Sequence, residues 1–281
     1  MRLTSFSLPG CLFLLASSLF AQGVVIVETR GPAQGSGATA TSRVHIEGDR
    51  LFILNEGDGG KQGVVFLGGP KIIRMLDYGN NTYREMTEQD MQQMGAQMGD
   101  AMADARKMME EKLKNMPPAQ RQMIEQMMKQ KMGAAGPQMG AQQPAPVVYT
   151  RVASGQSIRQ WTCDKYDGTR EGQKVWEVCA VDFAQFGVQP SDMQVFQQMA
   201  EMFKNLAPQG MEDAFNVGFD DTEREGAFRG VPVQRVSFRN GAPDRLFEVT
   251  EVTRQDVDDA LFEVPAGFQK VEMPTPGIRG R

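Results

Sequence analysis

The sequence has a single histidine among its 281 residues, and this scarcity excludes several kinds of catalytic centre. His45 alone cannot supply a catalytic triad, a multi-histidine zinc site or a facial triad. Phosphate-binding loops, nucleophile elbows and dinucleotide fingerprints are also absent from the sequence. The acidic clusters at 220–223 and 256–259 lack the alternating ligands and central glycine of a calcium loop. We therefore expect a protein that is not an enzyme, with no catalytic residue, no metal and no cofactor.

An excess of basic residues is missing too, because 30 Lys and Arg stand against 35 Asp and Glu, for a net charge of -5. This balance argues against nucleic acid as a partner. Beyond the first 21 residues no apolar run approaches the roughly 20 residues of a membrane-spanning helix. We expect no stable membrane span, and nothing in the composition indicates the oligomeric state.

The first 21 residues have the features of a secretory signal peptide. Arg2 precedes an apolar stretch from Leu8 to Phe20, and cleavage is expected after Ala21 or, as an alternative, after Ser18. Cys11 follows a lipoprotein-like Leu-Pro-Gly, but it comes before the main apolar run and is removed with the signal peptide. The sequence predicts a periplasmic or secreted protein.

Two cysteines remain after this processing, Cys163 and Cys179. They lie on two extended runs, 157–166 and 174–182, which flank turn-forming residues at 167–172. A hairpin centred near residue 171 places the two cysteines opposite each other. In an oxidising compartment this arrangement predicts a disulfide, worth about 3 kcal/mol in the chain-entropy model.

Short apolar runs separated by Gly, Asp and Asn predict two β sections, one at 23–87 and one from 147 to the C-terminal region. In 43–47, Val44 and Ile46 alternate with polar residues, so we expect one buried and one solvated face. The last expected strands are 231–238, 245–253 and 262–264. Together the two sections predict a sheet of roughly ten strands, which should curl under its own twist.

Methionines are concentrated between the two β sections, with 13 of the 20 from Met86 to Met139. Their spacing of three and four residues predicts a helix from residue 88, and Met116-Pro117-Pro118 separates it from a second helix that ends near Met132. The two helices form a helical hairpin insert, 88–132, followed by a flexible linker, 133–146. A further amphipathic helix is expected at 191–206, with Ser191 as its N-cap.

Several motifs together resemble a known family. The segment 260–268, Ala-Leu-Phe-Glu-Val-Pro-Ala-Gly-Phe, is similar to the F-x-V-P-x-G-[FY] ending of exported bacterial proteins with a curved sheet. The likeness is strengthened by Tyr-Arg-Glu-Met at 83–86, by Met-Pro-Pro-x-x-Arg at 116–121 and by the two-cysteine hairpin. The chain thus resembles the domain of unknown function 4412 family, which is akin in fold to the LolA and LppX carriers. The resemblance implies an α+β half-barrel, a curved antiparallel sheet with the helical hairpin and the further helix on its concave face, and it implies no catalytic residue.

We therefore expect a single folded domain at 22–272. It follows the signal peptide, 1–21, and precedes a disordered tail, 273–281. Its leading function is to bind an apolar ligand, a lipid or a lipidated partner such as a lipoprotein between the helices and the sheet. Methionine suits such a surface because its unbranched thioether repacks easily. The candidate ligand-binding residues are Met91, Met94, Met98, Met102, Met109, Met123, Met127, Phe196, Met199 and Phe203.

Two alternatives remain open at this stage. The chain can be a structural or protein-interaction module of the cell envelope, in which the methionines only fill a core. The methionine thioethers can instead bind copper(I), which favours soft sulfur ligands, although no histidine or cysteine lies in the methionine-rich segment.

Overall fold

The computed structural model describes residues 23–114, 145–204 and 227–273, and these ranges contain one sheet of twelve strands. The strands lie in the order β12-β6-β5-β4-β3-β2-β1-β11-β10-β9-β8-β7. Their bounds are β1 Gly23–Pro32, β2 Ala40–Glu47, β3 Arg50–Gly57, β4 Gly60–Leu67, β5 Ile72–Asp77, β6 Thr82–Thr87, β7 Val148–Ile158, β8 Trp161–Arg170, β9 Gln173–Val181, β10 Val231–Arg239, β11 Ala242–Gln255 and β12 Gln269–Lys270. The antiparallel β class is confirmed, with two more strands than expected and one parallel pair, β12 with β6.

Strand β1 joins the two β sections into this single sheet. It pairs with β2 along one edge and with β11 along the other, so that Val24 lies between Ile46 and Arg254. Tight turns connect most of the remaining neighbours. In the turn between β10 and β11, Asn240 and Gly241 both have positive φ angles, the conformation that an Asn-Gly hairpin turn favours.

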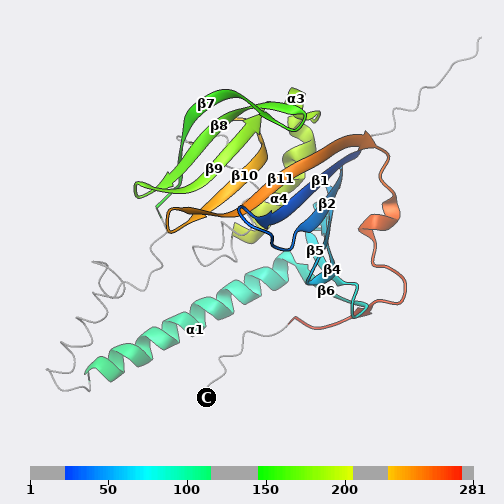
Figure 1. The fold of residues 1–281 in the computed structure, drawn as a ribbon. Helices are drawn as coiled ribbons and strands as arrows, with labels where there is room; N and C mark the ends of the chain where they lie inside the picture. Colours follow the sequence, from blue (N-terminus) through cyan, green and yellow to red (C-terminus); the bar gives the residue numbers. More distant parts are fainter. Residues whose placement is uncertain (1–22, 115–144, 205–226, 274–281) are drawn as a thin grey trace, which may run out of the picture.

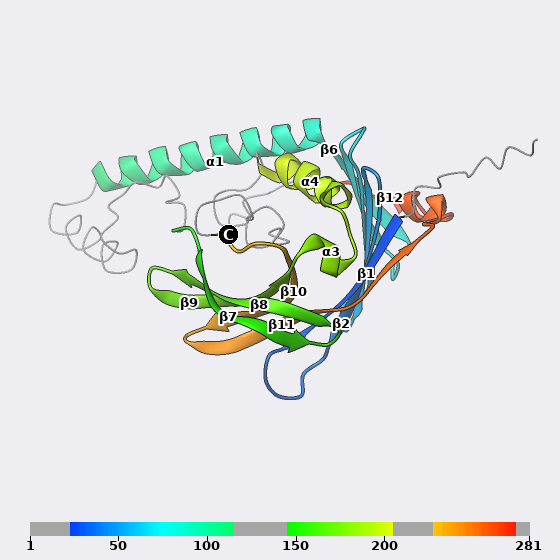
Figure 2. The same ribbon diagram turned by 90° about the horizontal axis from the view of Figure 1, so that it is seen from above.

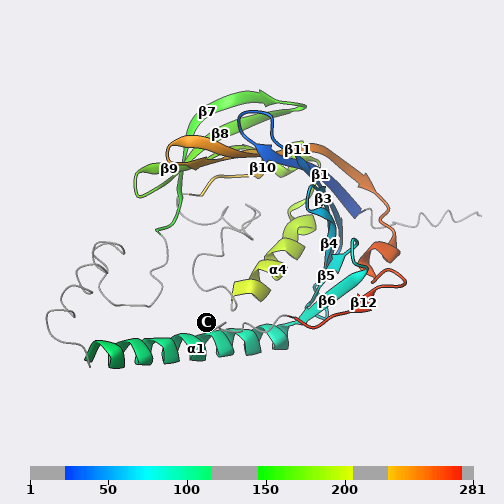
Figure 3. The same cartoon turned by 60° about the horizontal axis from the view of Figure 1, so that its bottom comes forward.

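The sheet is strongly bent, and α3 and α4 lie inside the bend (Figures 1 and 2). In Figure 2, β1 to β6 form one arm and β7 to β11 the other. The helices within the described ranges are α1 Glu88–Lys114, α3 Phe183–Phe186 and α4 Gln194–Lys204, with 3-10 turns η1 Pro190–Met193 and η3 Asp259–Phe262. Figure 3 shows α1 running from the end of β6 past α4 and across the open side of the bend. The half-barrel shape predicted for the sheet is therefore present.

The largest hydrophobic cluster joins both arms of the sheet to α3, α4 and the start of α1. Phe66 on β4, Val231 on β10 and Val195 on α4 are completely buried in it. A second cluster lies on the outer side of the first arm, where Phe262 of η3 covers Phe52 and Val65. The outer face that we expected to be solvated at 43–47 is thus half-covered, and His45 stacks on Phe52 with ring centroids 5.8 Å apart.

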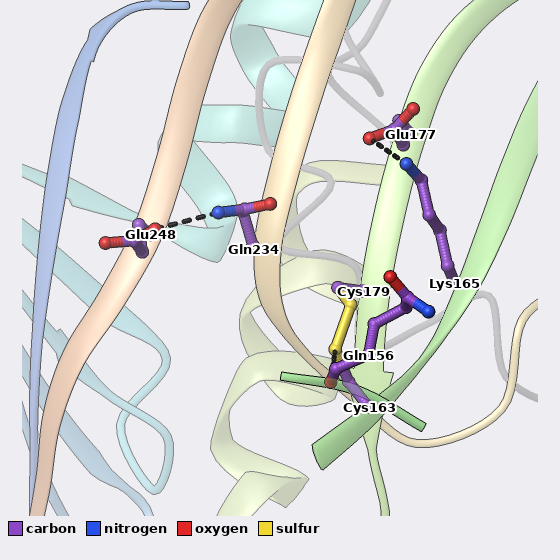
Figure 4. The surroundings of a disulfide bond; sticks show 7 residues. All are labelled: Gln156, Cys163, Lys165, Glu177, Cys179, Gln234 and Glu248. Atoms are coloured by element: carbon purple, nitrogen blue, oxygen red, sulfur yellow. Dashed lines mark hydrogen bonds and ion pairs between the residues drawn. A yellow bond between two sulfur atoms is a disulfide. The ribbon is translucent and has the colours of Figure 1, made fainter. Parts of the chain in front are cut away.

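The Cys163–Cys179 disulfide is confirmed, and it links β8 to β9 (Figure 4). The expected register was wrong by two residues, because Lys165 and not Cys163 lies opposite Cys179. Part of the shift comes from the turn, which is centred between Glu171 and Gly172 so that Arg170 lies opposite Gln173, and a bulge between Gly168 and Thr169 adds the rest. The bond therefore crosses the hairpin diagonally, over a Cα–Cα distance of 5.5 Å.

Three local expectations were wrong. The run 157–166 is not one strand, because Arg159, with a φ of 52°, makes the turn between β7 and β8. Ser191 is not the N-cap of the further helix that we expected at 191–206. That segment starts earlier with η1, where the backbone N–H of Gln189 donates to Asp192. Residues 262–264 are not a strand, because η3 turns Phe262 into the outer cluster.

The helical hairpin is described only in part. Its first helix, α1, begins at Glu88 because Thr87 and Asp90 cap it reciprocally, with Asp90 accepting from the Thr87 hydroxyl at 2.7 Å. The expected second helix, most of the linker 133–146, the signal peptide 1–21 and the tail from 274 lie outside the described residues. Among the described helices, none is long and apolar enough to cross a membrane.

The C-terminal segment is held on the first arm by an ion-pair network around Glu85 of β6. Glu85 accepts hydrogen bonds from Lys270 at 2.9 Å and from Arg74 at 2.9 Å. These bonds lower the pKa of the Glu85 carboxyl from its ordinary value, the bond from Lys270 contributing most. Arg74 also donates to the carbonyl of Phe262 at 3.5 Å, so that one network ties β5, β6, η3 and β12 together.

We predict that Glu85→Gln loosens the C-terminal segment. Because the native pKa is lowered, the ionised carboxylate adds stability at neutral pH, and this contribution is lost as the pH falls through the native pKa. The variant should lose about 1 kcal/mol of unfolding free energy at pH 7. Between pH 7 and pH 4 its unfolding free energy should fall less than that of the wild type, because it has no carboxylate to protonate at this position. Urea unfolding at pH 7 and pH 4 measures both effects. Glu272→Gln, at an exposed position of the same segment, is the control and should behave like the wild type.

Candidate ligand-binding site

A cavity of about 50 Å³ lies inside the bend, where the two arms meet under α3 and α4. Here β10 separates from β11, because Gln234 to Arg239 pair with β11 whereas Val231 and Pro232 pair only with β9 among the described strands. Proline has no N–H to donate and is tolerated at such a separation. Bulges next to Val233 and between Val27 and Glu28 add local twist on both sides of the cavity.

One side of the cavity is apolar. Helix α4 contributes Phe196, and α3 contributes Phe186, which stacks on Trp161 with ring centroids 6.1 Å apart. The α3 turn is fixed by Asp182, which accepts a hydrogen bond from the Gln185 backbone N–H, and by Gly187 in the left-handed conformation. The strands complete this side with Ile26, Val44, Ile53, Val233 and Val249.

The other side of the cavity is charged and aromatic. Arg30 forms an ion pair with Glu28, two residues away on the same face of β1, with its Nε donating at 3.0 Å. The guanidinium groups of Arg30 and Arg235 lie 5.5 and 5.2 Å from the ring centre of Phe247. Arg235 also lies over the Trp176 ring at 5.9 Å. Aromatic side chains and arginines therefore alternate across β9, β10, β11 and β1.

Arg235 has the most perturbed environment in this group. Burial lowers the pKa of its guanidinium, the nearby Arg30 lowers it further, and Glu28 opposes the shift. Arginine stays protonated in proteins, so the site keeps both positive charges at neutral pH.

Glu248 closes the same end of the cavity from β11. Its carboxylate accepts hydrogen bonds from Gln234 of β10 at 2.8 Å (Figure 4) and from Arg159 at the β7–β8 turn at 2.5 Å. Arg159 thus balances the charge of Glu248, and the β7–β8 turn is fixed next to the site.

A second cleft, of about 550 Å³, lies between the start of α1, the far end of α4 and the β4–β5 turn. Lys71 and Glu88 form an ion pair across it at 2.9 Å. Its lining is mostly polar, with Asp49, Gln198 and Glu201 next to the glycines of the turn. The described residues contain no cluster of His, Cys, Asp and Glu that suits a metal ion there or elsewhere.

The structure brings together only part of the predicted ligand-binding set. Met91, Phe196 and Met199 are buried in the main cluster and Phe203 packs against it, but only Phe196 lines the cavity. Met94 is half-buried on α1. Met98, Met102 and Met109 lie on α1 with side chains outside the described set, and Met123 and Met127 lie outside the described residues.

Reasoning from sequence missed the charged side of the site. The available signal was in β1, where Val24, Ile26, Glu28 and Arg30 share one face by the alternation of a strand. Charged residues that continue a buried apolar face indicate a polar end to the buried region. Arg235 and Phe247 gave no such signal, because bulges in β10 and in the β1–β11 pairing place them there.

Comparisons with known proteins assign no family to the chain. No family model matches it, and no curated protein matches it in sequence. The resemblance to the domain of unknown function 4412 family is therefore not confirmed.

The solved structures that are similar to it include three with the following values. An uncharacterized conserved protein from Thermus thermophilus is 10% identical with a TM-score of 0.44, over 91% of this chain and 92% of that one. PNGF-II is 11% identical with a TM-score of 0.34, over 90% of this chain but 31% of that one. A LolA superfamily protein from Nitrosomonas europaea is 7% identical with a TM-score of 0.27, over 86% and 90%. At these values none of the three establishes a function or a ligand for this chain.

We predict that Phe196→Ala destabilises the protein by about 3–5 kcal/mol, because the buried ring fills the space between α4 and the sheet. Chemical denaturation of the purified protein measures the change in unfolding free energy. Gln197→Ala, on the exposed face of the same helix, is the matched control and should change stability by less than about 0.5 kcal/mol. Equal stabilities for the two variants would contradict the packing of α4 described above.

Proposed function

We propose that the chain is an exported, non-enzymatic protein that binds an amphiphilic ligand, such as a lipid or a lipidated partner, between α4 and the curved sheet. The observation that carries this proposal is the division of the cavity into an apolar side and a charged side. Ligand sites are mostly apolar with a few convergent polar groups, and this lining has that composition.

The volume of the cavity is the main constraint on the proposal. About 50 Å³ holds a few water molecules but no acyl chain, so a ligand must move α4 or its side chains. Five buried methionines belong to the cluster that α4 joins, namely Met86, Met91, Met193, Met199 and Met202. Methionine side chains adapt to new neighbours at low cost, which supports a seam that can open for a ligand.

The Cys163–Cys179 disulfide supports export, because such bonds persist in oxidising compartments. We also propose that the protein is not an enzyme and that it is periplasmic or secreted.

A structural or interaction module with a filled core is the second candidate. The burial of Val195, Phe196 and Met199 favours it, because α4 already covers much of the inner face. Copper(I) binding stays a prediction, since three of the α1 methionines on which it depends have side chains outside the described set.

The test is a titration with N-phenyl-1-naphthylamine, a neutral fluorescent probe, together with native mass spectrometry of protein purified from its own envelope. We expect saturable probe binding and a co-purifying lipid. Val249→Phe adds a ring inside the cavity and should weaken probe binding about ten-fold or more, and Val249→Leu is the milder variant if the larger side chain impairs folding.

The control is Val148→Phe, at a position of β7 that is 48% exposed and lies outside the cavity lining. This variant should bind the probe like the wild type. A wild-type protein that neither binds the probe nor carries a lipid would contradict the proposal and favour the filled core.

A further inference from the structure

We propose that the outer edge of β7 pairs with β7 of a second copy of this chain. The two strands run antiparallel about a two-fold axis at Thr150, so that the sheets of the two copies join into one. This inference goes beyond the proposed function and does not depend on it, because the edge lies outside the lining of the cavity.

Strand β7 ends the sheet. It lies last in the strand order, and among the described strands it pairs only with β8 (Figures 1 and 3). The outer edge of such a strand presents backbone N–H and C=O groups to which another strand can add. A second strand is therefore the kind of partner that fits this position.

Apolar side chains are exposed along this edge. Only three large apolar side chains of the described residues are exposed, and two of them lie on β7, Val148 at 48% and Val152 at 51%. Thr150, between them, is exposed as well. All three residues are β-branched, and β-branched residues stabilise sheets through cross-strand pairs. Their grouping on one strand indicates an interface rather than scattered surface residues.

The features that usually protect an edge strand are missing from the first half of β7. The strand contains a single charged residue, Arg151, whose guanidinium donates to Asp164 of the same hairpin at 3.0 Å. Bulges, which twist an edge away from other strands, interrupt the register with β8 only beyond Arg151. Pairing with a further strand is therefore possible, and it is confined to the segment around 148–152.

The pattern of this segment is self-complementary, which selects a second copy as the occupant. Directly opposite residues of an antiparallel pair share one face, so a two-fold axis between two copies passes through one residue and its own counterpart. With the axis at Thr150, Val148 lies opposite Val152 of the second copy. Both exposed valines of each chain are then covered by the other chain.

The neighbouring registers are less favourable. An axis at Arg151 places two guanidinium groups opposite each other, and like charges in that position destabilise a pair. An axis at Tyr149 places Val152 opposite Pro146, which has no N–H to donate. The register centred on Thr150 avoids both problems.

The first experiment tests the axis by cross-linking. Opposite Cα atoms of an antiparallel pair are about 4.5–5.5 Å apart, a distance that a disulfide spans. Thr150→Cys should therefore form a disulfide-linked dimer under mild oxidation, which non-reducing electrophoresis detects. Val148→Cys is the matched control, because its two copies lie about 13 Å apart along the pair and should not be linked. Cys163 and Cys179 are already bonded to each other.

The second experiment measures the oligomeric state by sedimentation velocity. The paired segment is short, so the wild type should change from monomer to dimer over about 5–500 µM protein. The double variant Val148→Lys, Val152→Lys places lysines opposite each other and should weaken dimerisation about ten-fold or more. In the matched variant Val148→Lys, Val152→Glu each lysine lies opposite a glutamate of the other copy, and most of the wild-type affinity should return.

Three results would overturn the inference. A protein that stays monomeric at about 500 µM, with Thr150→Cys linked no more than Val148→Cys, lacks this pairing, and the same result is expected if the edge binds a different protein. A dimer that the two lysines do not weaken forms through another surface. Slow amide hydrogen exchange at 148–152 in the monomer would show that a segment of the same chain already covers the edge. None of these results affects the proposed ligand site.

Discussion

The pairing of β1 with β11 is the constraint on which the rest of the structure depends. Without it, β1 to β6 with β12 and β7 to β11 would be two separate smaller sheets, each with an unprotected edge. The pairing joins Gly23 to Gln255 across most of the chain, so its formation costs loop entropy before it contributes contacts. It also forces one continuous twist on twelve strands, and the sheet bends in response. The space inside that bend is where α3, α4 and the cavity lie.

The bend explains why charged residues reach an otherwise apolar interior. At the junction of the arms, β10 separates from β11, and the helices that cover the first arm do not fill the gap completely. Arg30 and Arg235 lie at this border with their guanidinium groups over the ring of Phe247, which compensates part of the cost of burying a charge. Arg30 also forms an ion pair with Glu28. A structure built only for stability would be expected to place apolar residues here, because replacing buried ion pairs by hydrophobic residues is often neutral or stabilising.

The limits of the sequence-based reasoning follow from the range of each interaction. Turns such as Asn240-Gly241, the strands between them and the disulfide depend on local chemistry, and they were predictable. The diagonal course of that disulfide was not, because the position of the turn and the bulge at Gly168 together change the pairing without changing the composition. The F-x-V-P segment illustrates the same limit. Phe262 has the character of a strand residue, but it packs from a 3-10 turn against Phe52, which lies in the first β section, far away along the chain. The arginine site requires partners from β1, β10 and β11, and no local pattern connects them.

A filled core and a ligand site between α4 and the sheet are compatible with each other. Helix α4 is short, and methionines make up a large part of what it buries, together with Val195 and Phe196. A helix of eleven residues gains little stability on its own, so its position depends on the contacts that it makes with the sheet. Flexible thioethers allow those contacts to be exchanged for contacts with a ligand at a small cost in free energy. In the absence of a ligand the same residues close the seam, which prevents the exposure of a large apolar surface to water. Under the proposed function, the filled core is the resting state of the protein, before a ligand separates α4 from the sheet.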